Sequence, residues 1–229
     1  MPAYIEMQVT FPNKRISSTF FIDVHRYFVA AGFDFLGSRK IDFNNNDFNF
    51  IDTTLEELSN RNQAMYEEEV RLNFPKKAFE SENIDSDEFY ETNYKQIVFK
   101  REGCSELLGI WTADKDGIML SLLMPEDEIS FYMKGAGRFY NQDKITPLAQ
   151  LARKLWEDGW VSTVQTMLEC DDPIYDAADI MNGIGILFRP FAVLPESAYK
   201  NFPKNYFNEA QIAMLANNGV YIEQTDRVV

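Results

Sequence analysis

The sequence predicts an α+β fold, in which about four helices pack against a mostly antiparallel sheet. The first observation is a run of short apolar segments between residues 96 and 133, separated by turn residues, which is typical of a β-meander. The second is that helices with an apolar stripe are predicted before and after this run, an arrangement that defines the α+β class. The third is that no stretch rich in Gly, Ser or Pro divides the 229 residues. We therefore expect one domain spanning residues 1–229.

The strands are predicted from apolar segments bounded by turn residues. They are residues 4–11, 33–36, 96–99, 107–112, 118–124, 128–133, 160–168, 184–188 and 220–223. Asp114-Lys-Asp-Gly117 is predicted as a hairpin turn, because its glycine tolerates the positive φ that such turns need. Pro190, Pro195 and Pro203 indicate a long loop near the C-terminus.

The helices are predicted from capping residues that precede an apolar stripe. They run from about Ser18 to Gly32, from Thr54 to Val70, from Pro147 to Gly159 and from Asn208 to Gly219. In order, the expected N-caps are Ser17 or Ser18, Thr53 or Thr54, Thr146, and Asn208. Three of these helices end in a glycine followed by an apolar residue, which is the sequence pattern of the Schellman motif. Ordinary helix termination explains this repeat; the alternative is a duplicated unit, in which Ala31-Gly32-Phe33 matches Asp158-Gly159-Trp160.

One stretch combines many carboxylates with aromatic side chains. Between Phe79 and Thr92 there are six acidic residues, and no basic residue separates them. A buried element could not carry this charge, and a solvated tail has no need of the aromatic residues. We therefore predict a surface that meets a basic protein partner, made by Glu80, Glu82, Asp85, Asp87, Glu88, Phe89, Tyr90 and Glu91.

The acidity of the chain is local. Residues 42–91 carry 14 acidic and 4 basic side chains, a net charge of −10 out of −14 for the whole chain. Such a concentrated field steers a cationic partner and raises its association rate, an effect that salt weakens. The alternative is a solvated loop and helix whose charge only keeps the protein soluble.

Composition excludes several classes of partner and compartment. The N-terminal residues include neither a basic region nor a continuous apolar one, so no signal peptide is expected. No apolar run approaches the ~18 residues of a membrane span, and a net charge of −14 disfavours nucleic acid and anionic lipid as partners. Cys104 and Cys170 are expected to be reduced thiols. Together these features predict a cytoplasmic protein.

No catalytic signature or metal site is predicted, and no cofactor is expected. His25 is the only histidine, and one histidine with two distant cysteines does not supply a zinc site. One alternative stays open for a second acidic cluster, which contains Asp171, Asp172, Asp176 and Asp179. These carboxylates could serve an enzyme as acid and base or hold a divalent metal. More simply, they form a turn with an aspartate that caps a helix.

In its general character the chain resembles bacterial immunity proteins, which neutralise a cognate toxin domain. The acidic stretch with its aromatic residues, the α+β body and the lack of a targeting signal are the features that carry this resemblance. It implies a non-catalytic protein that forms a one-to-one complex with a toxin, for example a basic nuclease whose substrate-binding cleft the carboxylates occupy. The alternatives are an enzyme that uses the second acidic cluster, and an acidic scaffold or phage-type accessory protein.

Overall fold

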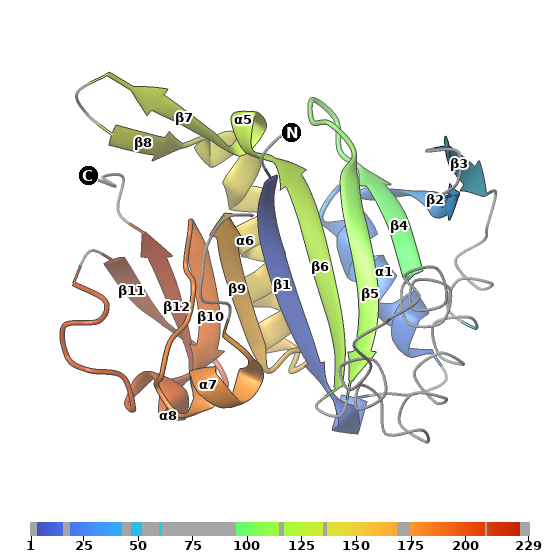
Figure 1. Cartoon of the computed structure of the whole chain (residues 1–229). Coiled ribbons are helices and arrows are strands. Elements are labelled where there is room, and N and C mark those ends of the chain that lie inside the picture. The colour runs from blue at the N-terminus through green and yellow to red at the C-terminus, as the bar shows by residue number, and fades with distance from the viewer. Residues whose placement is uncertain are drawn as a thin grey trace, which may run out of the picture. The chain divides into compact units, whose positions relative to one another are not determined.

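A computed structural model describes residues 4–15, 19–42, 47–51, 60, 95–114, 117–134, 137–168, 175–208 and 210–224 (Figure 1). Within these residues the fold is α+β, as predicted, with antiparallel strand pairs and five α-helices. The chain divides into two compact units, Met1–Thr10 with Leu123–Val229 (unit 1) and Phe11–Leu122 (unit 2). The prediction of a single domain is neither confirmed nor contradicted by this division and stays a prediction.

Unit 2 pairs five strands in the order β6-β5-β4-β2-β3, with helix α1 against β2. Their bounds are α1 (Phe20–Ala30), β2 (Asp34–Asp42), β3 (Asp47–Ile51), β4 (Lys95–Lys100), β5 (Leu107–Asp114) and β6 (Gly117–Pro125). The core of this unit is aromatic: the buried ring of Trp111 contacts Phe11, Phe20, Phe21 and His25. Large rings bury much apolar area per residue, so a few side chains suffice to join α1 to the strands.

Unit 1 pairs its strands in the order β11-β12-β10-β9-β1 and carries a separate two-stranded ribbon, β7-β8. The strands are β1 (Tyr4–Pro12), β7 (Ser130–Met133), β8 (Gly137–Tyr140), β9 (Thr163–Leu168), β10 (Phe191–Pro195), β11 (Ala210–Leu215) and β12 (Gly219–Gln224). The helices are α5 (Glu126–Ile129), α6 (Gln142–Glu157), α7 (Ala177–Met181) and α8 (Glu196–Tyr199), and a short 3-10 turn, Asn13–Arg15, follows β1. No helix among the described residues is both long and apolar enough to cross a membrane.

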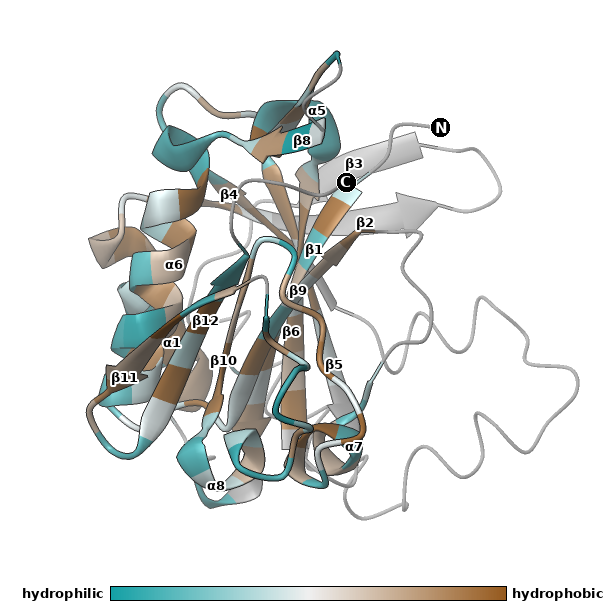
Figure 2. Cartoon of the chain, turned by 90° about the vertical axis from the view of Figure 1, so that its left-hand side faces the viewer, coloured by the Kyte–Doolittle hydropathy of each residue, from teal (hydrophilic) through white to brown (hydrophobic). Residues whose placement is uncertain are grey.

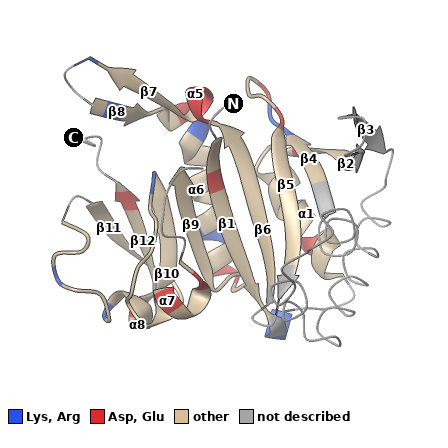
Figure 3. Ribbon diagram, in the orientation of Figure 1, with Lys and Arg blue, Asp and Glu red and all other residues tan. Residues whose placement is uncertain are grey.

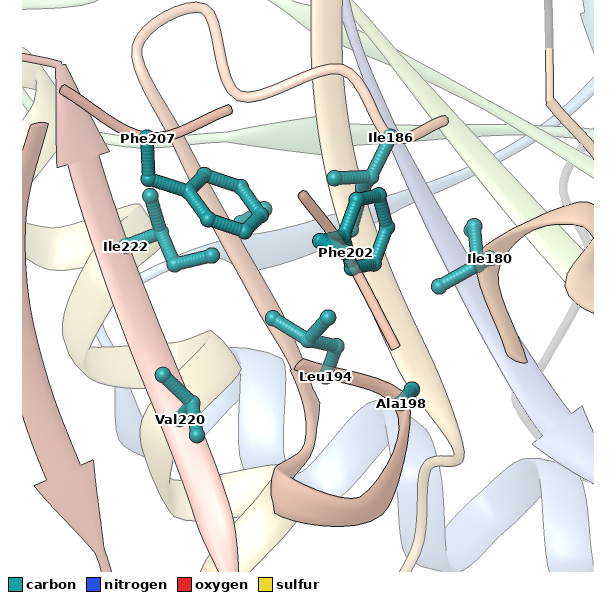
Figure 4. Packing of buried hydrophobic residues seen from close by; sticks show 9 residues of the cluster. Ile180, Ile186, Leu194, Ala198, Phe202, Phe207, Val220 and Ile222 are labelled. Carbon is teal, nitrogen blue, oxygen red and sulfur yellow. The ribbon is translucent and has the colours of Figure 1, made fainter. Parts of the chain in front are cut away.

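The central strands β10 and β12 of the unit 1 sheet are covered on both faces. On one face, alternate residues of β10 and β12 join α7, α8 and the following turn in a cluster, shown in Figure 4. Its members are Ile180, Ile186, Ala192, Leu194, Ala198, Phe202, Phe207, Val220 and Ile222. On the other face lies the amphipathic α6 (Figure 2). There the Arg153 guanidinium stacks 3.7 Å from the ring centroid of Tyr221. Two covered faces explain why β10 and β12 read as continuous apolar runs rather than as alternating ones.

The predicted Schellman terminations are confirmed at two helices. After α1, the N–H of Phe33 donates to the carbonyl of Phe28 (2.9 Å), and after α6 that of Trp160 donates to Leu155 (2.9 Å). The intervening Gly32 and Gly159 have φ values of 82° and 71°, which a residue with a Cβ adopts only with strain. The predicted strands 4–11, 96–99, 107–112 and 118–124 are also confirmed, as β1, β4, β5 and β6.

The predicted helix from Asn208 to Gly219 is wrong, because this segment is the hairpin β11-β12. Its turn contains Asn217 and Asn218, both with φ of 55°, and the N–H of Gly219 donates to the carbonyl of Ala216 (3.3 Å). Consecutive positive φ values occur in hairpin turns, which favour asparagine and glycine because these residues tolerate that conformation. The Asn-Asn-Gly sequence was thus a hairpin signal, which the helical spacing of apolar residues concealed.

The start of α6 is also wrong in the prediction. The helix begins at Gln142 with Asn141 as N-cap, so Pro147 lies inside it rather than at its first position. An internal proline lacks an N–H for the helical ladder. The burial of Leu148, Leu151 and Leu155 against the sheet outweighs that loss.

The remaining differences are smaller. The predicted strand 128–133 is helical at residues 128 and 129, which belong to α5, and is a strand only from Ser130. The N-cap of α1 is Thr19, and neither Ser17 nor Ser18 is described. Residues 184–188 form only a single parallel bridge to β9 rather than a strand, and the predicted loop after Pro190 contains β10 and α8. Strand β9 begins at Thr163, three residues later than predicted. The predicted helix 54–70 lies outside the described residues except for Asn60, which is helical.

Candidate functional site

The acidic surface predicted from the sequence lies outside the described residues. This applies to all its members: Glu80, Glu82, Asp85, Asp87, Glu88, Phe89, Tyr90 and Glu91. Its role in binding a basic partner stays a prediction.

The second acidic cluster has a structural explanation where it is described. Asp176 is the N-cap of α7, and its Oδ1 accepts a hydrogen bond from the N–H of Asp179 (2.8 Å). Asp179 Oδ2 in turn accepts from the N–H of Asp176 (3.4 Å), which completes a capping box. Helix capping thus accounts for the spacing of these two carboxylates, whereas Asp171 and Asp172 are not described. In the described part of the chain, no group of three His, Cys, Asp or Glu side chains is placed to hold a metal ion.

His25 is a buried core residue of unit 2. Its Nδ1–H donates to the carbonyl of Phe21, and its ring lies among Phe35, Phe99 and Trp111, with centroids 5.6–5.9 Å away. Burial lowers the pKa of His25 from 6.5 to about 4, because a charged imidazolium is poorly solvated there; the hydrogen bond to Phe21 opposes this shift. His25 is therefore neutral at physiological pH and packs as an aromatic side chain.

Of the two cysteines that are expected to be reduced, the structure describes only Cys104. Cys104 is a half-buried thiol, as expected for a reduced cysteine. Cys170 lies outside the described residues, so its redox state stays a prediction.

A cavity of about 390 Å³ opens in unit 1 beside the segment that precedes β10. Its lining consists of Ile186, Leu187, Phe188, Arg189, Asn205, Tyr206, Asn208 and Gln224. Tyr206 bridges the cavity wall, since its hydroxyl accepts from the N–H of Ile186 (3.0 Å) and donates to the carbonyl of the same residue (3.2 Å). The lining thus offers amides, a phenol and one guanidinium, which recognise polar groups rather than form an acid–base pair.

The β7-β8 hairpin carries the largest group of uncovered apolar side chains among the described residues. It extends away from the sheet of unit 1 as a separate ribbon (Figure 1). The consecutive residues Phe131, Tyr132 and Met133 have exposed fractions of 49%, 71% and 51%. Residues adjacent in a strand point to opposite faces, so both faces of the ribbon present apolar surface. Exposed apolar groups that cluster in this way mark interaction sites.

The hairpin is held in shape by Arg138, which lies opposite Tyr132 in the register of the two strands. The Nε and Nη2 atoms of Arg138 donate to the Tyr132 hydroxyl (3.1 and 2.6 Å), and Nη2 also pairs with Glu126 of α5 (2.6 Å). Burial lowers the pKa of Arg138, but its contacts with Tyr132 and Glu126 outweigh burial and hold this pKa above its usual value. The guanidinium is therefore always charged, and it orders a tyrosine that is otherwise mostly exposed.

The other face of the ribbon is ordered by aromatic stacking. Phe131 lies opposite Phe139 on β8, with ring centroids 5.8 Å apart and planes inclined by 19°. At the base of the hairpin, the Tyr140 hydroxyl donates to Gln224 Oε1 on β12 (2.9 Å), and the N–H of Asn141 donates to the carbonyl of Ile129 (2.7 Å). The ribbon thus presents aromatic side chains whose conformations are already fixed.

The sequence predicts a strand at residues 128–133 but not the exposed surface that it forms. The available signal was the run Phe131-Tyr132-Met133, because a strand with one buried face cannot hide three consecutive large apolar residues. Three consecutive apolar residues are also compatible with a strand that is covered on both faces. That arrangement is found in β10 and β12 but not in β7.

No family model, curated protein or solved structure matches this chain. The function is therefore inferred from the surfaces described above.

Proposed function

We propose that this chain is a non-catalytic binding protein that neutralises a cognate protein, in the manner of an immunity protein bound to its toxin domain. The observation that carries the proposal is the β7-β8 hairpin, with Phe131, Tyr132 and Met133 uncovered and two of their rings fixed by neighbouring side chains. Tyrosine and arginine are enriched among the residues that dominate binding energy. A fixed aromatic ring also loses little conformational freedom when a partner covers it.

The acidic residues 80–91 complete the proposal as the source of long-range attraction. The hairpin contributes apolar contact and slows dissociation, whereas six carboxylates attract a basic partner and speed association. The two surfaces therefore predict different kinetic signatures, which allows each to be tested separately.

The experiment takes the product of the adjacent gene as the candidate toxin and expresses it with and without the chain. Wild-type chain should restore growth and bind the purified toxin domain in surface-based kinetics. Tyr132→Ala should weaken binding at least 30-fold, about 2 kcal/mol, through faster dissociation. Met181→Ala, which shortens an exposed apolar residue outside the hairpin, is the matched control and should bind as the wild type does.

A second arm tests the acidic surface. Asp87→Lys combined with Glu88→Lys should slow association and reduce its dependence on salt, because both changes remove steering charge. Failure of the chain to bind or to restore growth would overturn the proposal. Binding that is unaffected by Tyr132→Ala would exclude the hairpin, and binding with rates independent of salt would exclude the acidic stretch.

A further inference from the structure

Strand β11 is an edge of the unit 1 sheet. It pairs with β12 over Ala210–Leu215, from Ala210 opposite Gln224 to Leu215 opposite Gly219. Among the described residues no strand pairs with its outer side. An edge strand presents a row of backbone N–H and C=O groups, which form a template for another strand.

This edge lacks the features that usually prevent pairing. Natural edge strands carry charged residues, prolines or bulges, yet the 13 residues from Ala210 to Ile222 include no charge and no proline. Figure 3 shows β11 without any charged residue. Ile212 and Met214, which share a face, have exposed fractions of 41% and 59%. The pairing of β11 with β12 has a regular register without a bulge.

The turn at the end of this edge is also held in place. Trp156 Nε1 donates to the carbonyl of Ala216 (3.0 Å), and Asn217 Nδ2 donates to the carbonyl of Glu157 (2.6 Å), so two side-chain bonds fasten the β11-β12 turn to the end of α6. Gly219 is required there, because an added Cβ would lie 2.1 Å from Trp156 Nε1. A strand that is already ordered loses little freedom when it pairs.

We propose that β11 is a self-association edge, at which two copies of this chain pair antiparallel across a two-fold axis. The inference goes beyond the proposed function and uses a different surface. When the same strand of two copies pairs antiparallel, the contact is isologous. Both copies therefore contribute the same backbone groups and the same apolar side chains. The partner is a second copy because the edge has no charge with which to attract a charged strand, and an uncharged apolar strand is what β11 itself supplies.

Charge also explains why this edge, rather than another surface, can bring two copies together. Each copy carries a net charge of −14, so two copies repel each other wherever charged surfaces approach. A contact limited to an uncharged strand keeps the like charges apart. The dimer should consequently become tighter as salt is added, the opposite of the salt effect expected for a basic partner.

The test measures molar mass by light scattering across a concentration series, together with sedimentation equilibrium. The wild type should shift from one chain of 26.6 kDa toward twice that mass as concentration rises. Met214→Lys should weaken dimerisation at least tenfold, because each dimer would then contain two lysines in an edge that otherwise carries no charge. This change reduces the net negative charge of each copy, so a general loss of repulsion would act in the opposite direction.

Met133→Lys is the matched control, since Met133 is an exposed strand methionine of similar exposure on the β7-β8 hairpin. It should leave the dimer intact while weakening the toxin complex. Gln211→Lys places a charge on the exposed opposite side of β11 and should again weaken the dimer. Circular dichroism and thermal unfolding check that each variant folds. A wild type that stays monomeric at all concentrations, or a dimer unaffected by both β11 variants, overturns the inference; both results leave the proposed function standing.

Discussion

Unit 1 contains two hairpins with uncovered apolar residues, and they are built in different ways. The β7-β8 hairpin stands apart from the sheet and is ordered by side chains, through the bonds of Arg138 to Tyr132 and Glu126. The β11-β12 hairpin is part of the sheet: it is held by its pairing with the rest of the sheet and by side-chain bonds of Trp156 and Asn217 that fasten its turn to α6. One hairpin presents aromatic side chains, and the other presents backbone donors and acceptors.

This difference indicates two kinds of recognition. Fixed aromatic side chains discriminate between partners by shape, because each ring must fit a pocket. An edge strand accepts any extended segment, and only its side chains limit which segment is suitable. We therefore expect the β7-β8 hairpin to contact a specific partner and β11 to contact another copy of the same strand.

Protonation of His25 is expected to have the largest effect, and it tests whether a change in unit 2 leaves the two hairpins of unit 1 unaffected. The folded pKa of His25, about 4, lies below the unfolded value of 6.5, so the unfolded chain binds a proton more readily between these values. The stabilisation is complete above pH 6.5 and is lost as pH falls toward 4, by about 3 kcal/mol in total. Urea unfolding at a series of pH values should show this loss in the wild type.

The control is His25→Phe, which retains an aromatic ring but cannot be protonated. Acidic side chains elsewhere in the chain also respond to pH, so the relevant quantity is the difference in pH slope between the two proteins. Identical slopes would show that His25 contributes nothing to acid sensitivity.

Arg138 provides a smaller change, which affects only one hairpin. Arg138→Met leaves Glu126 without its cation and Tyr132 without its donors, and should lower the free energy of unfolding by about 2 kcal/mol. Partner affinity should fall as Tyr132 loses its fixed position, whereas dimerisation through β11 should not change. Urea unfolding and the two binding assays measure these effects.

Arg138→Lys separates the two roles of the arginine. A lysine can still pair with Glu126, but it lacks the planar fork whose nitrogens also reach the Tyr132 hydroxyl. It should recover most of the stability and less of the partner affinity. Dimerisation that weakens in parallel with partner binding would show that the two hairpins do not act separately.

The sequence predicted those elements whose signals are local and consistent. Strand β1 alternates fully buried residues such as Ile5, Met7 and Val9 with half-buried ones, and the period of two is plain in the sequence. The helix ends at Gly32 and Gly159 were predictable because only glycine adopts their positive φ without strain. Prediction failed where tertiary burial overrides a local signal, as at Pro147 inside α6.

The site was less predictable than the fold. The charge of residues 79–92 is visible in the sequence, but whether Phe131 or Ile212 is covered depends on packing by distant elements. The sequence of Ala210–Leu215 does not indicate that this strand lies at an edge, because edge position depends on the order of strands in the whole sheet. Apolar residues at helical spacing even favoured a helix there, and the Asn-Asn-Gly turn was the stronger signal.

The smallest expected effect tests the turn that holds β11. Asn218 has φ of 55°, a conformation that asparagine tolerates and that costs alanine about 1 kcal/mol. Asn218→Ala should therefore lower the free energy of unfolding by about that amount, and weaken the dimer without affecting binding through the β7-β8 hairpin. Asn218→Gly is the control, since glycine adopts this φ freely and should match or exceed the wild type in urea unfolding. Equal losses of stability in both variants would contradict this prediction. They would show that the asparagine side chain, rather than the backbone conformation, stabilises the turn.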